Sequence, residues 1–282
     1  MTMPAKPLVA ALLFAMMVSP PLAAQTAATQ SDSNPAAEKY TPSVGQQGKD
    51  VVWVPTSQAL VDRMLEMAEL TADDRLVDLG SGDGRLVITA AKRGAVARGI
   101  EFNPDMVAIS KEAAKTEGVT ERAVFEQADI FESDFSDASV VTLFLLPSLN
   151  LRLRPTLLDM KPGTRVVSNS FAMEAWEPDE SVEVKENCTN YCHAYKWIVP
   201  AQVAGTWKIG ERELELKQTF QMLDGTLSDG TNERRISNAR LNGASITFSV
   251  DGQTYSGQVD DKQMRGTIDG KTDWTAQLVS MQ

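Results

Sequence analysis

Cysteine and histidine are nearly absent from this chain of 282 residues, which has two cysteines and one histidine, all within residues 188–193. A metal site there would need further ligands, and the neighbouring sequence supplies none. The C-x-x-x-C-H run also has one more spacer residue than the C-x-x-C-H of haem attachment. Because the cysteines bracket an expected hairpin turn, we favour a disulfide between Cys188 and Cys192, which suits an oxidising compartment.

Basic residues are fewer than acidic ones: the chain has 27 Lys and Arg and 38 Asp and Glu, which gives a net charge of −11. A DNA or RNA binder neutralises phosphates with clustered Lys and Arg, so this balance argues against a nucleic-acid partner. The acidity keeps the protein soluble, and it would also attract a basic partner such as a lysine-bearing protein. The sequence indicates no particular oligomeric state.

The apolar run at residues 8–18 is too short to span a bilayer as a stable helix. A lysine precedes it, and prolines end it before the small residues Ala23-Ala24 and then Gln25. This pattern predicts a cleavable signal peptide at residues 1–24, with an uncleaved membrane anchor as the alternative. We therefore expect a periplasmic or secreted protein with no stable membrane span after cleavage.

The rest of the chain divides into three parts by composition and pattern. Residues 25–50 are polar and lack hydrophobic periodicity, so we expect a flexible linker. Residues 51–203 alternate β-branched runs with amphipathic stretches, which predicts an α/β, Rossmann-like sheet with helices on both faces. Its seven strands, five parallel and then a hairpin, are expected at residues 75–79, 97–101, 123–128, 140–146, 164–168, 182–185 and 194–199. Residues 204–282 show recurrent Asp-Gly and Asn-Gly turns and predict a small antiparallel β-domain, either a barrel or a sandwich.

The strongest local signal is a glycine-rich loop between an expected strand and an expected helix, Asp78-Leu79-Gly80-Ser81-Gly82-Asp83-Gly84-Arg85. Glycines there let backbone N–H groups approach a ligand closely. A dinucleotide fingerprint needs a third glycine where this chain has Arg85, so the pyrophosphate spacing is not met. The spacing suits the compact amino-acid end of S-adenosyl-L-methionine (SAM) instead.

Two acids follow at the ends of the next strands. Glu101 is placed to accept hydrogen bonds from two ribose hydroxyls. Asp129 could accept from an adenine amino group with Ile130 or Phe131 covering the ring, or it could be a helix cap or turn residue. We assign SAM binding to one set of residues: Asp78, Gly80, Ser81, Gly82, Gly84, Glu101, Asn103, Asp129 and Ile130.

Four motifs occur together between about Asp50 and Pro178: Val54-Pro55-Thr56-Ser57, the glycine loop, Gly99-Ile100-Glu101-Phe102-Asn103-Pro104 and Leu145-Leu146-Pro147-Ser148-Leu149-Asn150. As a set they resemble the seven-β-strand lysine methyltransferases related to the mitochondrial enzyme that modifies the c-ring protein of ATP synthase. The resemblance implies a SAM-dependent methyltransferase acting on a protein lysine. It also implies that residues from two of the motifs line the acceptor site: Pro55, Thr56, Ser57, Leu146 and Pro147. The chain departs from that family in Trp53, in its signal peptide and in its C-terminal β-domain, so the identity of the substrate does not transfer.

Methyl transfer to lysine requires a neutral amine, which an apolar channel would favour by lowering the amine pKa. We expect Trp53, Phe144 or Trp176 to wall that channel, with the protein core as the alternative place for each. No dedicated base is evident, since His193 lies far along the chain from the glycine loop. Two other functions stay open: an exported binding module of the same fold without turnover, and a small-molecule methyltransferase.

Overall fold

The computed structural model describes residues 40–281. The expected signal peptide, and the expected linker as far as residue 39, lie outside this range. The first part of the described chain contains four helices and seven strands: α1 (Gln58–Met67), β1 (Arg75–Leu79), α2 (Arg85–Lys92), β2 (Val96–Glu101), α3 (Pro104–Thr116), β3 (Ala123–Gln127), β4 (Val140–Leu143), α4 (Pro147–Leu158), β5 (Arg165–Asn169), β6 (Glu180–Glu183) and β7 (His193–Ile198).

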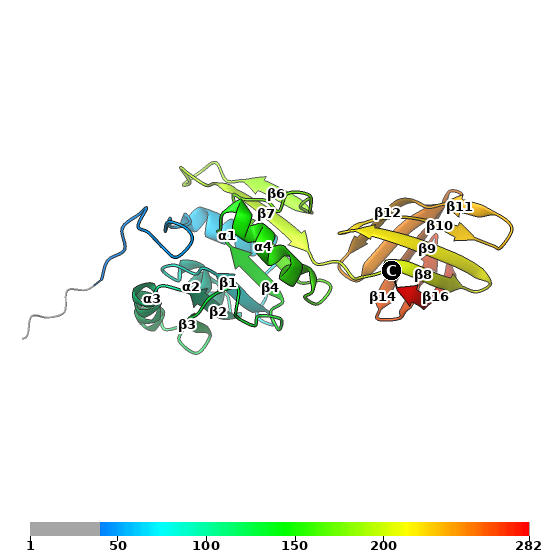
Figure 1. The fold of residues 1–282 in the computed structure, drawn as a ribbon. Helices are drawn as coiled ribbons and strands as arrows, with labels where there is room; N and C mark the ends of the chain where they lie inside the picture. The colour runs from blue at the N-terminus through cyan, green and yellow to red at the C-terminus, as the bar shows by residue number, and fades with distance from the viewer. Residues whose placement is uncertain (1–39, 282) are drawn as a thin grey trace, which may run out of the picture. The chain divides into compact units, whose positions relative to one another are not determined.

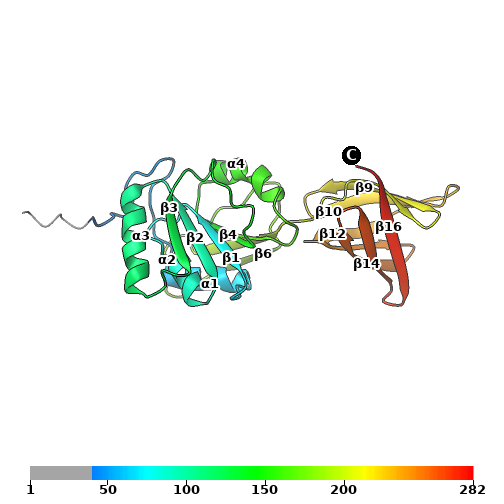
Figure 2. The ribbon, with the colours of Figure 1, turned by 90° about the horizontal axis from the view of Figure 1, so that it is seen from below.

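The seven strands form one sheet in the order β3-β2-β1-β4-β5-β7-β6, with β1 to β5 parallel and β7 antiparallel to β5. Apolar side chains leave both faces of this sheet. Leu76 packs with α1, α2 and α3, whereas Val77 packs with α4 on the opposite face. Figure 2 shows α4 on one side of the sheet and α1 and α2 on the other. The expected α/β methyltransferase-like sheet is therefore confirmed, and its carboxyl edge is the place where a ligand would bind.

The β-domain is a barrel, one of the two expected alternatives (Figure 1). Its strands are β8 (Gly205–Ile209), β9 (Arg212–Thr219), β10 (Met222–Ser228), β11 (Glu233–Arg235), β12 (Ser237–Asn242), β13 (Ser245–Val250), β14 (Gln253–Asp260), β15 (Gln263–Ile268) and β16 (Thr272–Met281). Pairing of β9 with β10 closes eight strands into a ring, and β11 pairs only with β10. Stacked and edge-on contacts among Phe248, Tyr255 and Trp274 fill its interior. Alternation of buried and exposed residues along these strands explains why the sequence shows a period of two here.

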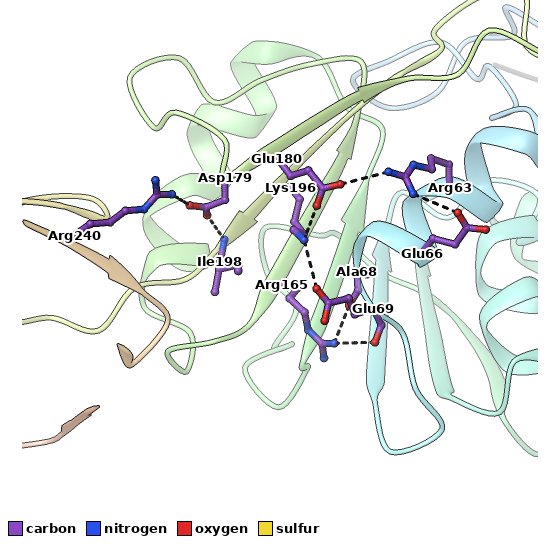
Figure 3. Close-up of polar contacts among 10 residues, drawn as sticks. All are labelled: Arg63, Glu66, Ala68, Glu69, Arg165, Asp179, Glu180, Lys196, Ile198 and Arg240. Atoms are coloured by element: carbon purple, nitrogen blue, oxygen red, sulfur yellow. Dashed lines mark hydrogen bonds and ion pairs between the residues drawn. The ribbon is translucent and has the colours of Figure 1, made fainter. Parts of the chain in front are cut away.

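A polar network joins helix α1 to the far edge of the sheet (Figure 3). The side chain of Lys196 on β7 is only 9% exposed, and its Nζ lies 2.7 Å from a carboxylate oxygen of Glu180 on β6. Arg63 of α1 reaches the other oxygen of Glu180 at 3.4 Å. A buried cation is costly unless it is paired, so Glu180 allows Lys196 to sit in this sheet. The network holds the β6–β7 hairpin against α1.

The N-terminal end of the described chain corrects the expected linker. Residues 40–50 are held by specific contacts, so the expected linker at 25–50 is too long at this end. Trp53 N donates to the carbonyl of Gln46, Gly45 N donates to the carbonyl of Trp53, and Lys49 forms an ion pair with Asp129. The composition gave no sign of this, because the stabilising partners lie as much as 80 residues away.

No helix among residues 40–281 is both long and apolar enough to cross a membrane.

Candidate active site

A cavity of about 460 Å³ opens at the carboxyl ends of β1, β2 and β4, and its volume is typical of a small-molecule site. It is bounded by the glycine loop, the ends of these strands, the segment before α1 and the β6–β7 turn. The lining residues used below are Lys49, Trp53, Pro55, Thr56, Asp78, Gly80, Ser81, Gly82, Glu101, Phe102, Asn103, Asp129, Ile130, Phe144, Leu146, Phe171 and Tyr191. The sheet order places Glu101 and Asp129 toward one end of this cavity and Phe144 and Phe171 toward the other.

The glycine loop leaves space that a side chain would fill. Gly80 and Gly82 have φ angles of +80° and +53°, in the left-handed region that favours glycine. A Cβ on Gly82 would lie 2.7 Å from Nε1 of Trp53. The hydroxyl of Ser81 is buried and has no hydrogen-bond partner among the described residues. A buried polar atom without a partner and a bare backbone facing a cavity are what a polar ligand would satisfy.

Glu101 is the last residue of β2, and two backbone N–H groups orient its carboxylate. One carboxylate oxygen accepts a hydrogen bond of 2.9 Å from Gly82 N, and the other accepts one of 2.9 Å from Asn103 N. Each carboxylate oxygen can accept more than one hydrogen bond, so both keep capacity toward the cavity. Asn103 itself caps α3, since its side chain accepts from the N–H groups of Asp105 and Met106. The carboxylate is therefore oriented before any ligand arrives, which suits the ribose role that we expect for it.

Asp129 follows β3 and is engaged by a residue that the sequence analysis did not single out. Its carboxylate accepts from Phe131 N at 3.0 Å and forms an ion pair with Lys49, whose Nζ also lies 4.7 Å from the ring centre of Phe102. The hydrogen bond from Lys49 holds the pKa of Asp129 below its ordinary value. Asp129 is thus an ionised turn residue at the cavity wall, and a ligand amino group would share it with Lys49.

Asp78 is buried at the carboxyl end of β1, where the hydroxyl of Thr142 donates to it at 2.7 Å. Burial raises the pKa of Asp78 to about 7, and the nearby charges of Glu101 and Asp83 act in the same direction. The hydrogen bond from Thr142 opposes this shift but does not cancel it. Asp78 therefore changes charge near neutral pH while lining the cavity.

We expect SAM to bind more tightly as pH rises through about 7. Below that pH Asp78 is neutral, and a ligand with a sulfonium and an ammonium group must displace its proton; above it the carboxylate already carries the complementary charge. Calorimetric titration of the full chain should give a dissociation constant roughly tenfold lower at pH 8 than at pH 6, because the ionised fraction of a group with a pKa of about 7 rises roughly tenfold between these two pH values. In Asp78→Asn this dependence should vanish. An equal slope in the variant would show that another group titrates.

The opposite end of the cavity is apolar and aromatic. Pro55, Thr56 and Leu146 line it, as expected for an acceptor site. Thr56 is held in place because its hydroxyl accepts from Asn169 Nδ2 at 3.1 Å and its carbonyl accepts from Arg85 at 2.7 Å. Three rings stand beside these residues: Phe144, which we expected, and Phe171 and Tyr191, which the sequence analysis missed.

Four expected site residues have other roles. Ser57 caps α1, where its hydroxyl accepts from Leu60 N, and Pro147 is the first residue of α4, so neither lines the cavity. Gly84 caps α2 and lies against Phe125 and Ser110, which leaves no space for a Cβ. Trp176 is fully buried in the core, where its carbonyl accepts from Trp197 Nε1. Ser57, Pro147 and Gly84 thus belong to motifs beside the cavity but serve the local backbone, and Trp176 takes the core position that we gave as its alternative.

The expected disulfide is confirmed. Cys188 and Cys192 are joined, with their Cα atoms 5.8 Å apart, and they close the turn between β6 and β7. His193, the next residue, is exposed, and its Nε2 lies 4.0 Å from Oε1 of Glu183. It does not line the cavity.

These features fit SAM. The glycine loop would present backbone N–H groups to an amino-acid end, Glu101 has free acceptor capacity for ribose hydroxyls, and Asp78 would offer negative charge to a cationic ligand. The acceptor end is apolar and lies next to the loop.

Comparison with known proteins agrees with this geometry. Residues 78–180 match the family described as the ANTKMT methyltransferase domain. A protein-lysine N-methyltransferase of Saccharolobus islandicus is 43% identical over 152 residues, which cover 53% of this chain and 94% of that protein. The mouse adenine nucleotide translocase lysine N-methyltransferase is 32% identical over 130 residues, covering 45% of this chain and 56%, about half, of that enzyme.

A solved structure gives the same picture of the fold. The RNA methyltransferase from Salinibacter ruber, in complex with S-adenosyl-L-homocysteine, shares 47% sequence identity at a TM-score of 0.50 and covers 53% of this chain and 96% of that one. The glycine loop, the oriented carboxylate of Glu101 and the extent of these matches lead to one conclusion: the chain belongs to the family of SAM-dependent protein-lysine N-methyltransferases.

Proposed function

We propose that this chain transfers a methyl group from SAM to the side-chain amine of a lysine in a protein outside the cytoplasm. The observation that carries the proposal is the cavity itself, in which a cofactor end built from the glycine loop and Glu101 meets an apolar acceptor end. The matched relatives that are named for lysine acceptors support the same chemistry.

SAM, when bound, supplies a methyl group that is already activated on a sulfonium, so transfer needs alignment and a neutral amine. Thr56, fixed through its hydroxyl and its carbonyl, and Leu146 would hold the acceptor chain in line, and such positioning can lower a barrier by ~7–11 kcal/mol in well-oriented systems. Apolar and aromatic walls exclude water and favour the uncharged amine over the ammonium. Deprotonation of the amine then needs no dedicated side-chain base.

Two features support an exported protein. The signal-peptide pattern of residues 1–24 is one. The other is the Cys188–Cys192 disulfide, since disulfides persist in oxidising compartments and are rare in the cytosol. A basic envelope protein would be attracted to this acidic chain, with its net charge of −11.

RNA is the second candidate acceptor, because the Salinibacter ruber relative is named an RNA methyltransferase. The charges at the cavity argue against RNA. Its two basic lining residues are already paired, Lys49 with Asp129 and Arg85 with Asp83, whereas RNA binding needs free Lys and Arg for phosphates.

The experiment that decides the acceptor is incubation of the purified full chain with methyl-labelled SAM and separate envelope and cytoplasmic extracts. We expect label in envelope protein, resistant to ribonuclease, lost on protease treatment, and recovered as methyl-lysine after acid hydrolysis. Glu101→Ala serves as the inactive control and Glu126→Ala, on the neighbouring strand and outside the cavity, as the active one.

Label recovered in RNA would favour the second candidate, and label in a small molecule would favour a small-molecule methyltransferase. Absence of transfer to any fraction, with SAM still bound, would favour a binding module. The same cell fractions test export: the protein should be found in the periplasm or medium with the mass of a chain that begins at Gln25.

A further inference from the structure

Tyr191 is carried to the acceptor end of the cavity by the β6–β7 turn. Strand β7 runs antiparallel to β5, with Ala194 opposite Asn169, so β7 begins at the carboxyl edge of the parallel strands. Ser170 N donates to the carbonyl of His193 at 2.8 Å and fixes this register up to the turn. The turn therefore lies at the edge of the sheet where ligands of such folds bind.

The three rings at this edge contact one another. The ring centre of Tyr191 is 5.2 Å from that of Phe144, in an edge-to-face arrangement, and 6.1 Å from that of Phe171. Phe144 and Phe171 are 6.2 Å apart and stacked. All three rings line the cavity, and we call them the aromatic collar.

Tyr191 does not have the character of a core residue. It is 46% exposed, and its backbone has a φ angle of +56°, a left-handed conformation that is unfavourable for a bulky residue. The disulfide between Cys188 and Cys192 closes the turn around it. A strained, half-exposed ring that is held over a cavity indicates a ligand-binding role.

We infer that the disulfide-closed turn is an acceptor-specificity element, which holds Tyr191 so that the aromatic collar binds an alkylammonium side chain, that is, lysine and its methylated forms. The inference deepens the proposed function and rests on it for the identity of the acceptor. Aromatic faces attract ammonium and methylated ammonium groups, and their apolar surface packs on the methylene chain. Tyr191 and both cysteines lie beyond residues 78–180, the range that the family model matches.

The test is a binding measurement that requires no turnover. The full chain, saturated with S-adenosylhomocysteine, is titrated with butyltrimethylammonium, which has the chain and the head group of trimethyl-lysine, and shifts are followed by NMR. Tyr191→Ala should weaken binding roughly three- to tenfold, the effect expected for one partly exposed aromatic face. Tyr191→Phe should bind as the wild type does. His193→Ala, a change beside the turn but outside the cavity, should also leave binding unchanged.

The double variant Cys188→Ser, Cys192→Ser tests the role of the disulfide as a positioning device. It should weaken binding of butyltrimethylammonium several-fold while the SAM dissociation constant is unchanged. With hexalysine as the methyl acceptor, both this variant and Tyr191→Ala should raise KM and leave kcat within about twofold.

The outcomes separate the two proposals. Binding that depends on Tyr191 supports the collar even if no methylated lysine is ever found, which would count against the proposed function alone. Absence of probe binding by the wild type, or equal binding by Tyr191→Ala, overturns the collar whatever the acceptor is. Loss of SAM affinity in Tyr191→Ala would also overturn it, because the residue would then support the cofactor end.

Discussion

Gly82→Arg should abolish measurable SAM binding and leave the fold intact. Gly82 has a φ angle of +53°, and any Cβ there would press on the indole of Trp53 at 2.7 Å. Trp53 lines the cavity and can move, so the core is spared, whereas a guanidinium would enter the cavity beside Trp53. We expect a left-handed arginine to cost roughly 1–2 kcal/mol of stability.

Gly118→Arg is the matched control for this variant. Gly118 also has a positive φ, +68°, but a Cβ there meets nothing within 4 Å, and the residue does not line the cavity. Both variants should show a similar decrease in unfolding temperature, while only Gly82→Arg should show no SAM binding in calorimetry. Wild-type affinity in Gly82→Arg would mean that the ligand does not lie against this loop.

The strands of the sheet could be predicted from sequence because they are buried on both faces and read as short β-branched runs. β1 at Arg75–Leu79 has the expected bounds. β4 is shorter than expected: it ends at Leu143, and the apolar residues Phe144 to Leu146 leave the sheet to wall the cavity. An apolar run in the sequence does not show whether its residues form a buried strand or line a ligand-binding cavity.

The glycine loop and Glu101 could be found in the same way, because their spacing reflects contacts within one β-α-β unit. Lys49 could not, since its partner Asp129 is 80 residues away and the segment around it has the composition of a linker. Tyr191 was missed although it lies between the two cysteines that drew attention. The signal that would have found it is topological: a hairpin strand antiparallel to β5 must begin at the ligand edge of the sheet.

Glu101→Ala should weaken SAM binding by about two orders of magnitude, because one carboxylate has two tasks. It accepts 2.9 Å hydrogen bonds from Gly82 N and Asn103 N, which hold the loop and the start of α3 around the cavity. It is also the acceptor that we expect for the ribose hydroxyls. Hydrogen bonds to a charged group contribute about 1.5–3 kcal/mol each, so the lower end of this range, about 3 kcal/mol for the two bonds to the ligand, already gives this magnitude.

Glu101→Gln separates the two tasks. The amide keeps one acceptor oxygen but turns an N–H group toward one of the two backbone donors, so the loop loosens while a ribose contact survives, and we expect an intermediate affinity. Glu126→Ala, which removes a carboxylate paired with Arg98 on the adjacent strand, should bind SAM normally. If Glu101→Ala bound SAM as tightly as Glu126→Ala does, the carboxylate would only support the loop, and the ribose would have to be held by other groups of the cavity. A loss of affinity in Glu101→Ala with an unfolding temperature within a few degrees of the wild type would place the effect at the ligand.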